Sequence, residues 1–352
     1  MKYELNDKIK SLSPYSVDKQ TYKIRLDANE SFINLPNQIV EQLKANLDEI
    51  NFNRYPDPDA DELCLAYAQY YGLDRKYIVA GNGSDELISV IFSSFLKKSD
   101  SVVVLSPDFS MYKFYAHICE CKVLDYPKCN AEIDVEELIE FCRVNNPQMI
   151  VFSNPCNPTS LSLETSQVKR VIENFDGLVV LDEAYMDFDD SSLIESAAQY
   201  DNLIVLRTCS KMMGLAALRV GFAVANEKIV SALRATKSPY NVNSVSQIMA
   251  TTVLKNKKYL DGCRKRIIES RDFLYNALKP ICADNGVEVM NTKTNFVFIK
   301  SENAALLFEY LKTKNILVRC FGKYLRITAG NENENVELVK EIKMFFKGDA
   351  VI

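Results

Sequence analysis

Short, almost continuously apolar runs alternate with helical patterns through the first two thirds of the chain. The runs have the length and β-branched content of buried strands and lie at 101–105, 148–153, 178–182, 203–207 and 220–225. Segments between them, such as 135–144, 166–175 and 192–200, carry apolar residues at helical spacing. Strands without polar alternation, joined by helices, predict an α/β fold whose mainly parallel sheet is covered by helices on both faces.

The pattern changes near residue 240. A long helical stretch at 245–278 leads to strand-like runs at 295–300, 316–319 and 325–330, with a helix at 303–313 and another at the end. This order predicts a smaller α+β domain. We therefore expect an N-terminal arm at 1–30 with little core of its own, a large domain at 31–240, and a linking helix with a small C-terminal domain at 241–352.

Composition narrows the class of protein. The chain has 352 residues, of which 47% are hydrophobic and 25% charged, as in a globular enzyme. The net charge of −5 comes without a basic run, so nucleic acid is not an expected partner. No apolar run approaches the roughly 20 residues of a membrane span, and the polar N-terminus does not resemble an export signal.

Cysteine and histidine usage argues against metal and triad chemistry. The ten cysteines form no framework pattern, which predicts free thiols in a reducing cytoplasm. Cys119 and Cys121 have no second pair at zinc-finger spacing, so no metal site is expected. His117 is the only histidine, so we do not expect a catalytic triad that depends on histidine.

Chemically capable residues gather where the predicted strands end. Those that follow a strand or open the helix at 84 are Asp182, Tyr185, Asn157, Thr208, Ser210, Lys211, Phe109, Ser84 and Asp85. Each alone has an ordinary structural explanation, such as a strand-end cap or a solvated lysine. In parallel α/β sheets, however, ligands bind beyond the carboxyl ends of the strands. We therefore expect one site at this edge.

Two cations stand in an unusually apolar stretch, RTCSKMMGLAALRVGF at 207–222. Burial of Lys211 or Arg219 without a partner would cost several kcal/mol, so both are expected to meet an anionic or covalent partner. The glycine turn at 81–83 feeds a helix N-terminus, whose N–H groups and dipole attract a phosphate. Arg219 adds a charged fork for the same group.

The other residues suit an aromatic, amine-reactive ligand. Thr208 and Ser210 offer hydroxyl groups to the phosphate, Phe109 offers a face for a ring, and Asp182 suits a protonated ring nitrogen. Lys211 supplies an amine that desolvation makes more nucleophilic. A phosphate, a protonatable ring and an amine-reactive group together predict pyridoxal 5'-phosphate as the cofactor.

Motifs in family order support this interpretation. They are LDANES (26–31), NRYPDPDADEL (53–63), GNGSDELI (81–88), SNPCNPTS (153–160), VVLDEAYMDF (179–188), LRTCSKMMGLAALRVGF (206–222), TNFVFIK (294–300) and LRITAG (325–330). The chain resembles the fold-type I pyridoxal-phosphate aminotransferases, and among them the histidinol-phosphate aminotransferases most closely. Ser160, Cys156 and Ala217 depart from the usual Gly, Asn and Gly, which affects the subfamily more than the enzyme class.

The resemblance implies a role for each matched residue. Lys211 would bond to the cofactor and shuttle a proton, and Asp182 would keep the ring nitrogen protonated. The remaining cofactor contacts would come from Tyr185, Asn157, Phe109, from the Ser84 and Asp85 N–H groups, and from Thr208, Ser210 and Arg219. Tyr55 would reach the phosphate in the other subunit of a homodimer with shared sites. The alternative interpretation is that Tyr55 is an aromatic side chain that packs within its own loop beside Pro56.

The substrate remains the most open question. Arg319 and Arg326 fall in adjacent strand-like runs, and two close arginines favour a phosphate dianion between them. The resemblance adds Tyr15 and Asn29 to this set. We therefore expect histidinol phosphate as amino donor and 2-oxoglutarate as acceptor. Aromatic amino acids, and decarboxylation of threonine phosphate, are the alternatives. A non-catalytic cofactor-binding sensor is disfavoured, because Lys211 and Asp182 are both present.

Overall fold

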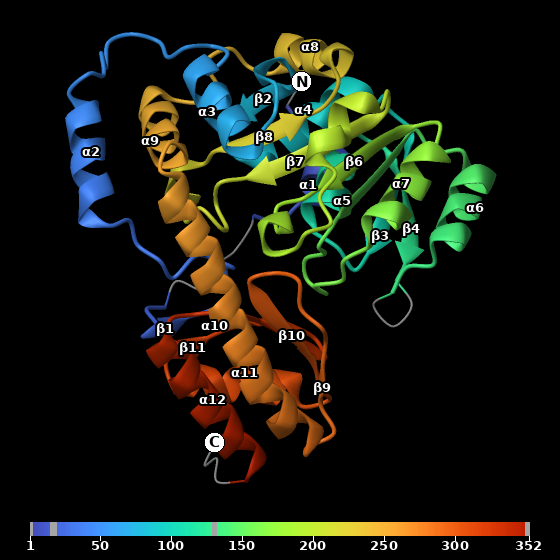
Figure 1. Cartoon of the computed structure of the whole chain (residues 1–352). Helices are drawn as coiled ribbons and strands as arrows, with labels where there is room; N and C mark the ends of the chain where they lie inside the picture. The colour runs from blue at the N-terminus through green and yellow to red at the C-terminus, as the bar shows by residue number, and fades with distance from the viewer. Residues whose placement is uncertain (1–2, 15–19, 129–131, 349–352) are drawn as a thin grey trace.

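A seven-stranded sheet forms the centre of the larger lobe in the computed structural model, which describes residues 3–14, 20–128 and 132–348 (Figure 1). Its spatial order is β2-β8-β7-β6-β5-β3-β4. The bounds are β2 Ile78–Gly81, β3 Ser101–Ser106, β4 Lys122–Pro127, β5 Met149–Ser153, β6 Leu178–Asp182, β7 Leu203–Thr208 and β8 Gly221–Val224. Strands β3 to β7 pair in parallel, while β8 is antiparallel to both neighbours. The prediction of a mainly parallel α/β sheet is confirmed.

Alternate side chains of each strand enter two different cores. In β7, Leu203 and Val205 belong to one core, and Ile204 and Leu206 belong to the other. Helices with core residues on the first face are α2 Asn37–Leu47, α3 Asp61–Tyr71, α6 Val135–Asn145, α7 Thr165–Glu173 and α9 Ser244–Leu254. On the second face they are α4 Ser84–Phe95, α5 Met111–Ile118 and α8 Glu227–Thr236. This coverage explains why the strands lack polar alternation.

Several elements differ from their sequence patterns. Strands β2 and β4 give weak signals, since β2 has four residues and β4 is an edge strand whose side chains are mostly exposed or half-buried. The helical pattern at 192–200 forms the 3₁₀-helix η3, Ile194–Gln199. The stretch at 245–278 forms two helices, α9 and α10 Lys257–Ala283, which are separated at 255–256. Shorter 3₁₀-helices are η1 Arg75–Tyr77, η2 Met186–Phe188 and η4 Ala216–Leu218.

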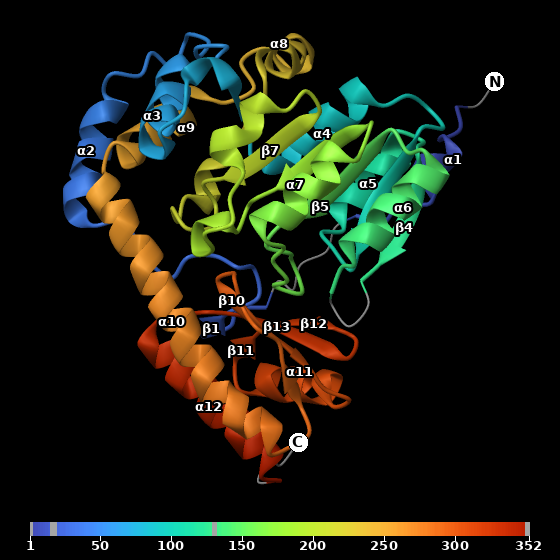
Figure 2. The same cartoon turned by 45° about the vertical axis from the view of Figure 1, so that its right-hand side comes forward.

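The smaller lobe contains a four-stranded sheet of order β12-β13-β10-β9, flanked by helices (Figure 2). The strand bounds are β9 Glu288–Val289, β10 Phe296–Lys300, β12 Arg319–Phe321 and β13 Tyr324–Thr328. The helices are α11 Ala304–Thr313 and α12 Glu332–Phe346. In β10, Val297 and Ile299 enter the core of this lobe, while Phe296 and Phe298 face the larger lobe's core. The second face of this sheet therefore turns toward the large lobe.

Packing refines the proposed domain division. Strand β1, Ile24–Arg25, pairs in parallel with β11, Ile316–Leu317, and Ile24 and Leu26 enter the small lobe's core. The arm thus contributes to a core at its C-terminal end. Helix α1, Asp7–Lys10, lies against α5 instead. Along α10, Ile267 belongs to the large core and Leu274 to the small one, so we propose that the lobes meet within α10.

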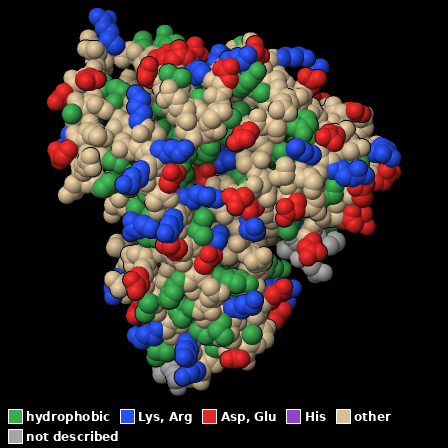
Figure 3. Space-filling view, in the orientation of Figure 1, with side chains coloured by type: hydrophobic (Ala, Val, Ile, Leu, Met, Phe, Trp, Pro, Cys, Tyr) green, Lys and Arg blue, Asp and Glu red, His purple; other side chains and the backbone are tan. Residues whose placement is uncertain are grey.

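Within the described ranges, every helix is too short or too polar to cross a bilayer. Figure 3 shows Lys and Arg side chains interspersed with Asp and Glu over the visible face. A search for grouped His, Cys, Asp and Glu side chains with metal-binding potential found none within the described part of the chain.

Candidate active site

The carboxyl edge of the large sheet collects the predicted residues. Asp182 ends β6, Thr208 ends β7, and Asn157 follows β5. Phe109 lies between β3 and α5, and Ser84 is the first residue of α4, directly after the turn that leaves β2. Strand β2 runs in the same direction as β7, because both are antiparallel to β8. The sheet therefore delivers all five positions to one edge.

Asp182 is a carboxylate held almost entirely out of water. It is 4% exposed, and its oxygens accept hydrogen bonds from Tyr112 Oη at 2.8 Å and from the Ala184 N–H at 3.0 Å. Burial raises the pKa of Asp182 to about 6, while these two donors act in the opposite direction. No Lys or Arg of the described residues forms an ion pair with it. This carboxylate is therefore suited to a cationic ring nitrogen.

Tyr185 and Lys211 both contact the N-terminal arm. Asn29 Nδ2 donates to Tyr185 Oη at 2.8 Å, and Lys211 Nζ donates to the carbonyl of Ala28 at 3.2 Å. The Lys211 ammonium also lies 5.7 Å from the centre of the Tyr185 ring. Asn29 itself is buried in a left-handed conformation with a φ of 54°. The arm thus lines the space next to the predicted reactive amine.

Two glycines shape the turn at the N-terminus of α4. Gly83 has a φ of +86°, and a Cβ there would stand 2.8 Å from Arg219 Nη2. A Cβ on Gly221 would stand 2.4 Å from the Ser84 nitrogen. No side chain caps α4 at its N-cap residue. The N–H groups of its first turn, beside the Arg219 guanidinium, therefore form a cradle that fits the predicted phosphate.

The expected burial of both cations is wrong. Lys211 is half-buried, and the Arg219 side chain is 47% exposed. Both belong to the segment after β7, whose Met and Leu side chains pack inward while these cations project from the sheet edge. Arg219 has a φ of 52°, and its Nη2 lies 4.0 Å from Asp85 Oδ2. Their cationic heads therefore face a space open to a ligand, rather than the core.

Arg326 extends from the small lobe to Asn157, one of the residues predicted to contact the cofactor ring. Its Nη1 donates to Asn157 Oδ1 at 2.5 Å, and its Nη2 donates to the carbonyl of Asp27 at 2.7 Å. Arg319 is its direct cross-strand partner in β12 and β13. Both guanidinium groups lie over the Phe321 ring, at 5.9 Å for Arg319 and 5.6 Å for Arg326. The structure thus places the two arginines side by side.

Other predicted residues are placed as follows. Phe109 is half-buried, and its ring lies edge-on to that of Tyr112 at 5.6 Å. Thr208 Oγ1 accepts a hydrogen bond from the Ser210 N–H, and both residues are buried. Sequence reasoning missed Tyr112. Its only signal is a position on the first turn of the helix that follows Phe109.

Two predicted residues remain, Tyr55 and Tyr15. Tyr55 is 81% exposed and stacks on Tyr240 at 4.7 Å, so the alternative of a packed loop aromatic is wrong for the isolated chain. Tyr15 lies outside the described residues.

Ser160 adopts the geometry for which a glycine is usual. Its φ is 62°, and its buried hydroxyl accepts a hydrogen bond from the Lys293 N–H at 2.8 Å and lies 3.0 Å from Thr294 Oγ1. The turn therefore keeps its left-handed conformation, and the additional hydroxyl connects the loop after β5 to the segment before β10.

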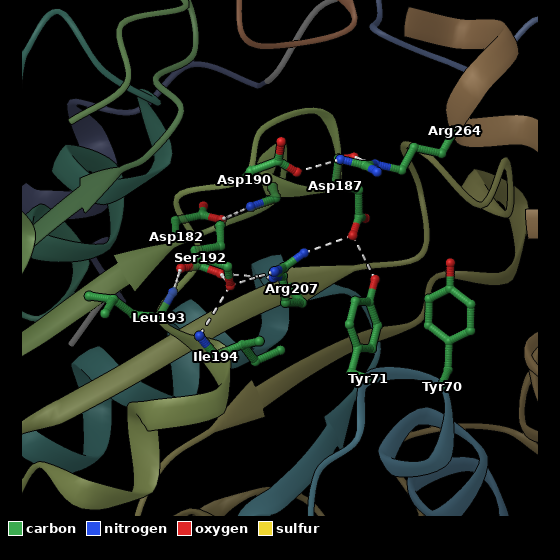
Figure 4. A network of polar contacts seen from close by, with 12 residues as sticks. Tyr70, Tyr71, Asp182, Asp187, Asp190, Ser192, Leu193, Ile194, Arg207 and Arg264 are labelled. Atoms are coloured by element: carbon green, nitrogen blue, oxygen red, sulfur yellow. Dashed lines mark hydrogen bonds and ion pairs between the residues drawn. The ribbon is translucent and has the colours of Figure 1, made fainter. Parts of the chain in front are cut away.

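A buried ion-pair network supports the same strands from the opposite face (Figure 4). Because side chains alternate along a strand, Arg207 points away from Thr208. Arg207 donates to Glu183 Oε2 at 3.0 Å, to Asp187 Oδ1 at 2.8 Å and to Ser192 Oγ at 2.9 Å. Arg264 of α10 donates to the Asp187 carbonyl and to Asp190. The network thus joins β6, β7 and helix α10 on the face of the sheet opposite the site.

Comparison with known proteins places the chain in a family. Residues 21–342 match the family model for aminotransferase class I and II. The chain belongs to this family. A histidinol-phosphate aminotransferase of Clostridium novyi is 42% identical over 342 residues, covering 95% of each chain. The predicted family and enzyme class are therefore confirmed.

Solved structures agree on the fold of this aminotransferase. A histidinol-phosphate aminotransferase of Sinorhizobium meliloti, in complex with pyridoxal-5'-phosphate, has a TM-score of 0.89 and 22% identity, and covers 99% of both chains. An L-threonine-O-3-phosphate decarboxylase of Porphyromonas gingivalis has a TM-score of 0.77 and 24% identity, and covers 92% of this chain and 99% of that one. The fold class is confirmed, while the fold alone does not separate these activities.

Proposed function

We propose that this aminotransferase binds pyridoxal phosphate and transfers the amino group of histidinol phosphate to 2-oxoglutarate. The observation that carries the choice of substrate is the cross-strand pair of Arg319 and Arg326, with Arg326 hydrogen-bonded to Asn157 at the ring side of the site. Two neighbouring guanidinium groups repel each other, and a phosphate monoester dianion relieves that repulsion better than one carboxylate does.

Most of the predicted residues would hold the cofactor in place. Ser84, Asp85, Thr208, Ser210 and Arg219 would hold the cofactor phosphate. Asp182 would keep the ring nitrogen protonated, while Tyr185 and Asn157 would bind the phenolic oxygen and Phe109 would cover the ring.

Pyridoxal phosphate, when bound, supplies an electron sink for cleavage at the donor carbon. Lys211 would take the proton from that carbon and pass it to the cofactor. Its half-buried amine, which donates to the Ala28 carbonyl, is placed beside Tyr185 for that transfer.

The relatives support the same substrate. Curated relatives from 34% to 42% identical, each covering at least 94% of this chain, are named histidinol-phosphate aminotransferases. A threonine-phosphate decarboxylase shares the fold at 24% identity, and its substrate also carries a phosphate. We further propose a homodimer with shared sites, and a cytoplasmic location that suits the free cysteine thiols of the described segments.

A donor comparison tests the proposal. The pyridoxal form of the enzyme would be mixed separately with histidinol phosphate, histidinol, phenylalanine and threonine phosphate, and loss of its visible absorption band would be followed. We expect histidinol phosphate to react with the highest kcat/KM, at least about 30-fold above histidinol, because one charge-assisted contact contributes about 2–5 kcal/mol. Equal reaction with phenylalanine would replace the proposal by an aromatic aminotransferase. Release of carbon dioxide from threonine phosphate would replace it by a decarboxylase.

A further inference from the structure

A buried lysine lies just beyond β4, outside the set of predicted site residues. Lys128 Nζ donates to Asp108 Oδ2 at 3.1 Å, to the Pro107 carbonyl at 2.8 Å and to Cys156 Sγ at 2.9 Å. The side chains of Lys128 and Asp108 are both 0% exposed. An ammonium group has three N–H donors, so these three partners use all of them.

The carboxylate of Asp108 also has several hydrogen-bond partners. It accepts hydrogen bonds from the Phe109 N–H at 2.8 Å and from the Ser153 N–H at 3.2 Å, and also from the Ser153 hydroxyl. Ser153 Oγ in turn accepts from the Asn157 N–H at 3.1 Å. The ion pair and its hydrogen bonds to Cys156 and Ser153 therefore join the loop after β3 to the loop after β5.

Those two loops carry separate parts of the cofactor site. The loop after β3 presents Phe109, and the loop after β5 presents Asn157. Asn157 continues the chain of contacts through its side chain to Arg326. Cys156, beside Asn157 in the loop after β5, belongs to the same cluster, because its sulfur accepts from Lys128.

The charge on Lys128 persists despite its burial. Burial alone would lower the pKa of its ammonium group, but Asp108 and Cys156 more than offset that effect, so the pKa is raised. Loss of the lysine would leave the Asp108 carboxylate buried without a counterion, which is strongly unfavourable. The loop after β3 would then relax toward water and carry Phe109 with it.

We propose that Lys128 is a positioning residue for the cofactor: its ion pair with Asp108 fixes the loop of Phe109 against the loop of Asn157. The inference rests on the proposed function, since a bound pyridoxal phosphate is the ligand that would use both loops at once. It assigns Lys128 no contact with the substrate.

The experiment measures cofactor binding rather than turnover. Apoproteins of the parent, Lys128→Met, Lys128→Met/Asp108→Asn and Lys122→Met would be titrated with pyridoxal phosphate by calorimetry. Titrations would run at a temperature where circular dichroism shows every variant folded. Lys122 begins the same strand on the exposed side, so Lys122→Met is the matched control. The pH midpoint of the bound cofactor's visible band would be measured alongside.

We expect Lys128→Met to raise the dissociation constant by about tenfold or more, which is the size found when outer contacts that orient a binding group are removed. Its pH midpoint should move, because Asn157 would no longer be held at the phenolic oxygen. The double variant should lie between Lys128→Met and the parent, since it buries no unpaired charge. Lys122→Met should match the parent.

Specific results would overturn the inference. A Lys128→Met protein with a lower melting temperature, but with the parent's dissociation constant and pH midpoint, would show a purely structural lysine. If Lys128→Met does not fold, the double variant decides: weaker binding than the parent supports the inference, and parental binding overturns it. A parent that binds no pyridoxal phosphate would overturn the proposed function itself, and this inference with it.

Discussion

At the scale of one residue, the buried carboxylate of Asp182 lowers the stability of the folded apoprotein. Burial raises its pKa to about 6, above the ordinary value of about 3.9. Between these two values the folded apoprotein holds a proton that the unfolded chain has released. Stability therefore falls as the pH rises through this window, and the full penalty persists above pH 6. A cationic ring nitrogen would remove that penalty.

The neutral variant Asp182→Asn should therefore stabilise the apoprotein at pH 8. We expect a gain of about 3 kcal/mol in the free energy of unfolding, since the pKa is raised by about two units and each unit corresponds to about 1.4 kcal/mol. The gain should shrink to less than about 1 kcal/mol near pH 4, where the folded carboxyl is protonated and the unfolded one is about half protonated. Urea unfolding at pH 8 and pH 4 checks this. A gain that is independent of pH would show that the carboxylate is not destabilised by burial.

Arg326 is the residue through which substrate choice is most directly tested. Arg326→Ala should lower kcat/KM for histidinol phosphate by about 2–5 kcal/mol in transition-state binding, mainly through KM. Reaction with unphosphorylated histidinol should change far less. Lys323→Ala, in the same hairpin and paired with Glu302, is the control. Because Arg326 also contacts Asn157, cofactor affinity would be measured separately. Equal losses for both donors would refute a phosphate contact.

The sequence predicted the residues that carry recognisable chemistry, but not those that support them. Lys211 and Asp182 follow strand ends, where a sheet edge is a predictable location. Tyr112 and Lys128 act through contacts between elements far apart in the chain, and sequence spacing does not report such contacts. The burial of Arg219 was predicted wrongly, because an apolar run does not reveal which way a cation leaves the backbone.

At the scale of elements, paired strands β6 and β7 present opposite chemistry on their two faces. Asp182 and Thr208 lie toward the site, while Glu183 and Arg207 pair behind them. Glu183 is fully buried, and burial raises its pKa against the lowering effect of Arg207. The pair should therefore hold the two strand ends in register.

Arg207→Met should destabilise the protein by about 3–5 kcal/mol, because it leaves Glu183 buried without a counterion. Arg207→Met/Glu183→Gln should recover part of this loss, since it buries no unpaired charge. Arg170→Met, which breaks an exposed pair with Glu136, is the matched control and should change the free energy of unfolding very little. Urea midpoints at pH 7.5 give the comparison. Equal effects of Arg207→Met and Arg170→Met would show that the buried pair contributes no more than a surface pair.

Long apolar strands and amphipathic helices were predictable, because their periodicity follows from local burial. Strand β4 was not, since an edge strand that buries few side chains and is interrupted by Lys122 and Asp125 resembles a loop. Strand β1 has only two residues and depends on β11, far along the chain. Its existence follows from the small lobe's assembly, which no local pattern encodes.

At the scale of the whole molecule, one helix and one arm connect the two lobes. Helix α10 supplies side chains to both cores, and Arg264 on it reaches the network behind β6 and β7. The arm runs from the small core at Ile24 to Asn29 beside Tyr185. The site is thus built from segments of both lobes, which favours assembly of the substrate pocket when the lobes approach each other.

The exposed Tyr55 points to a larger assembly. Exposed apolar side chains of this size, such as Phe52, Tyr55 and the stacked Tyr240, mark interaction surfaces when they lie close together. If Tyr55 completes the phosphate site of a partner, the active unit is a two-fold dimer. Light scattering should therefore give the mass of a dimer at assay concentration. A fully active monomer would refute both the dimer and the shared site.

Mixing two inactive variants tests sharing directly. Tyr55→Ala retains Lys211, and Lys211→Ala retains Tyr55. In a heterodimer of the two, one site would combine the intact Lys211 of one chain with the intact Tyr55 of the other. Random reassembly of equal amounts makes half of the dimers mixed, with one good site in each, so activity should return to about a quarter of the parent's. Tyr55→Phe, which keeps the ring, separates loss of the hydroxyl from loss of packing. If Tyr55 served its own subunit, every site of the mixture would lack one group, and no activity would return.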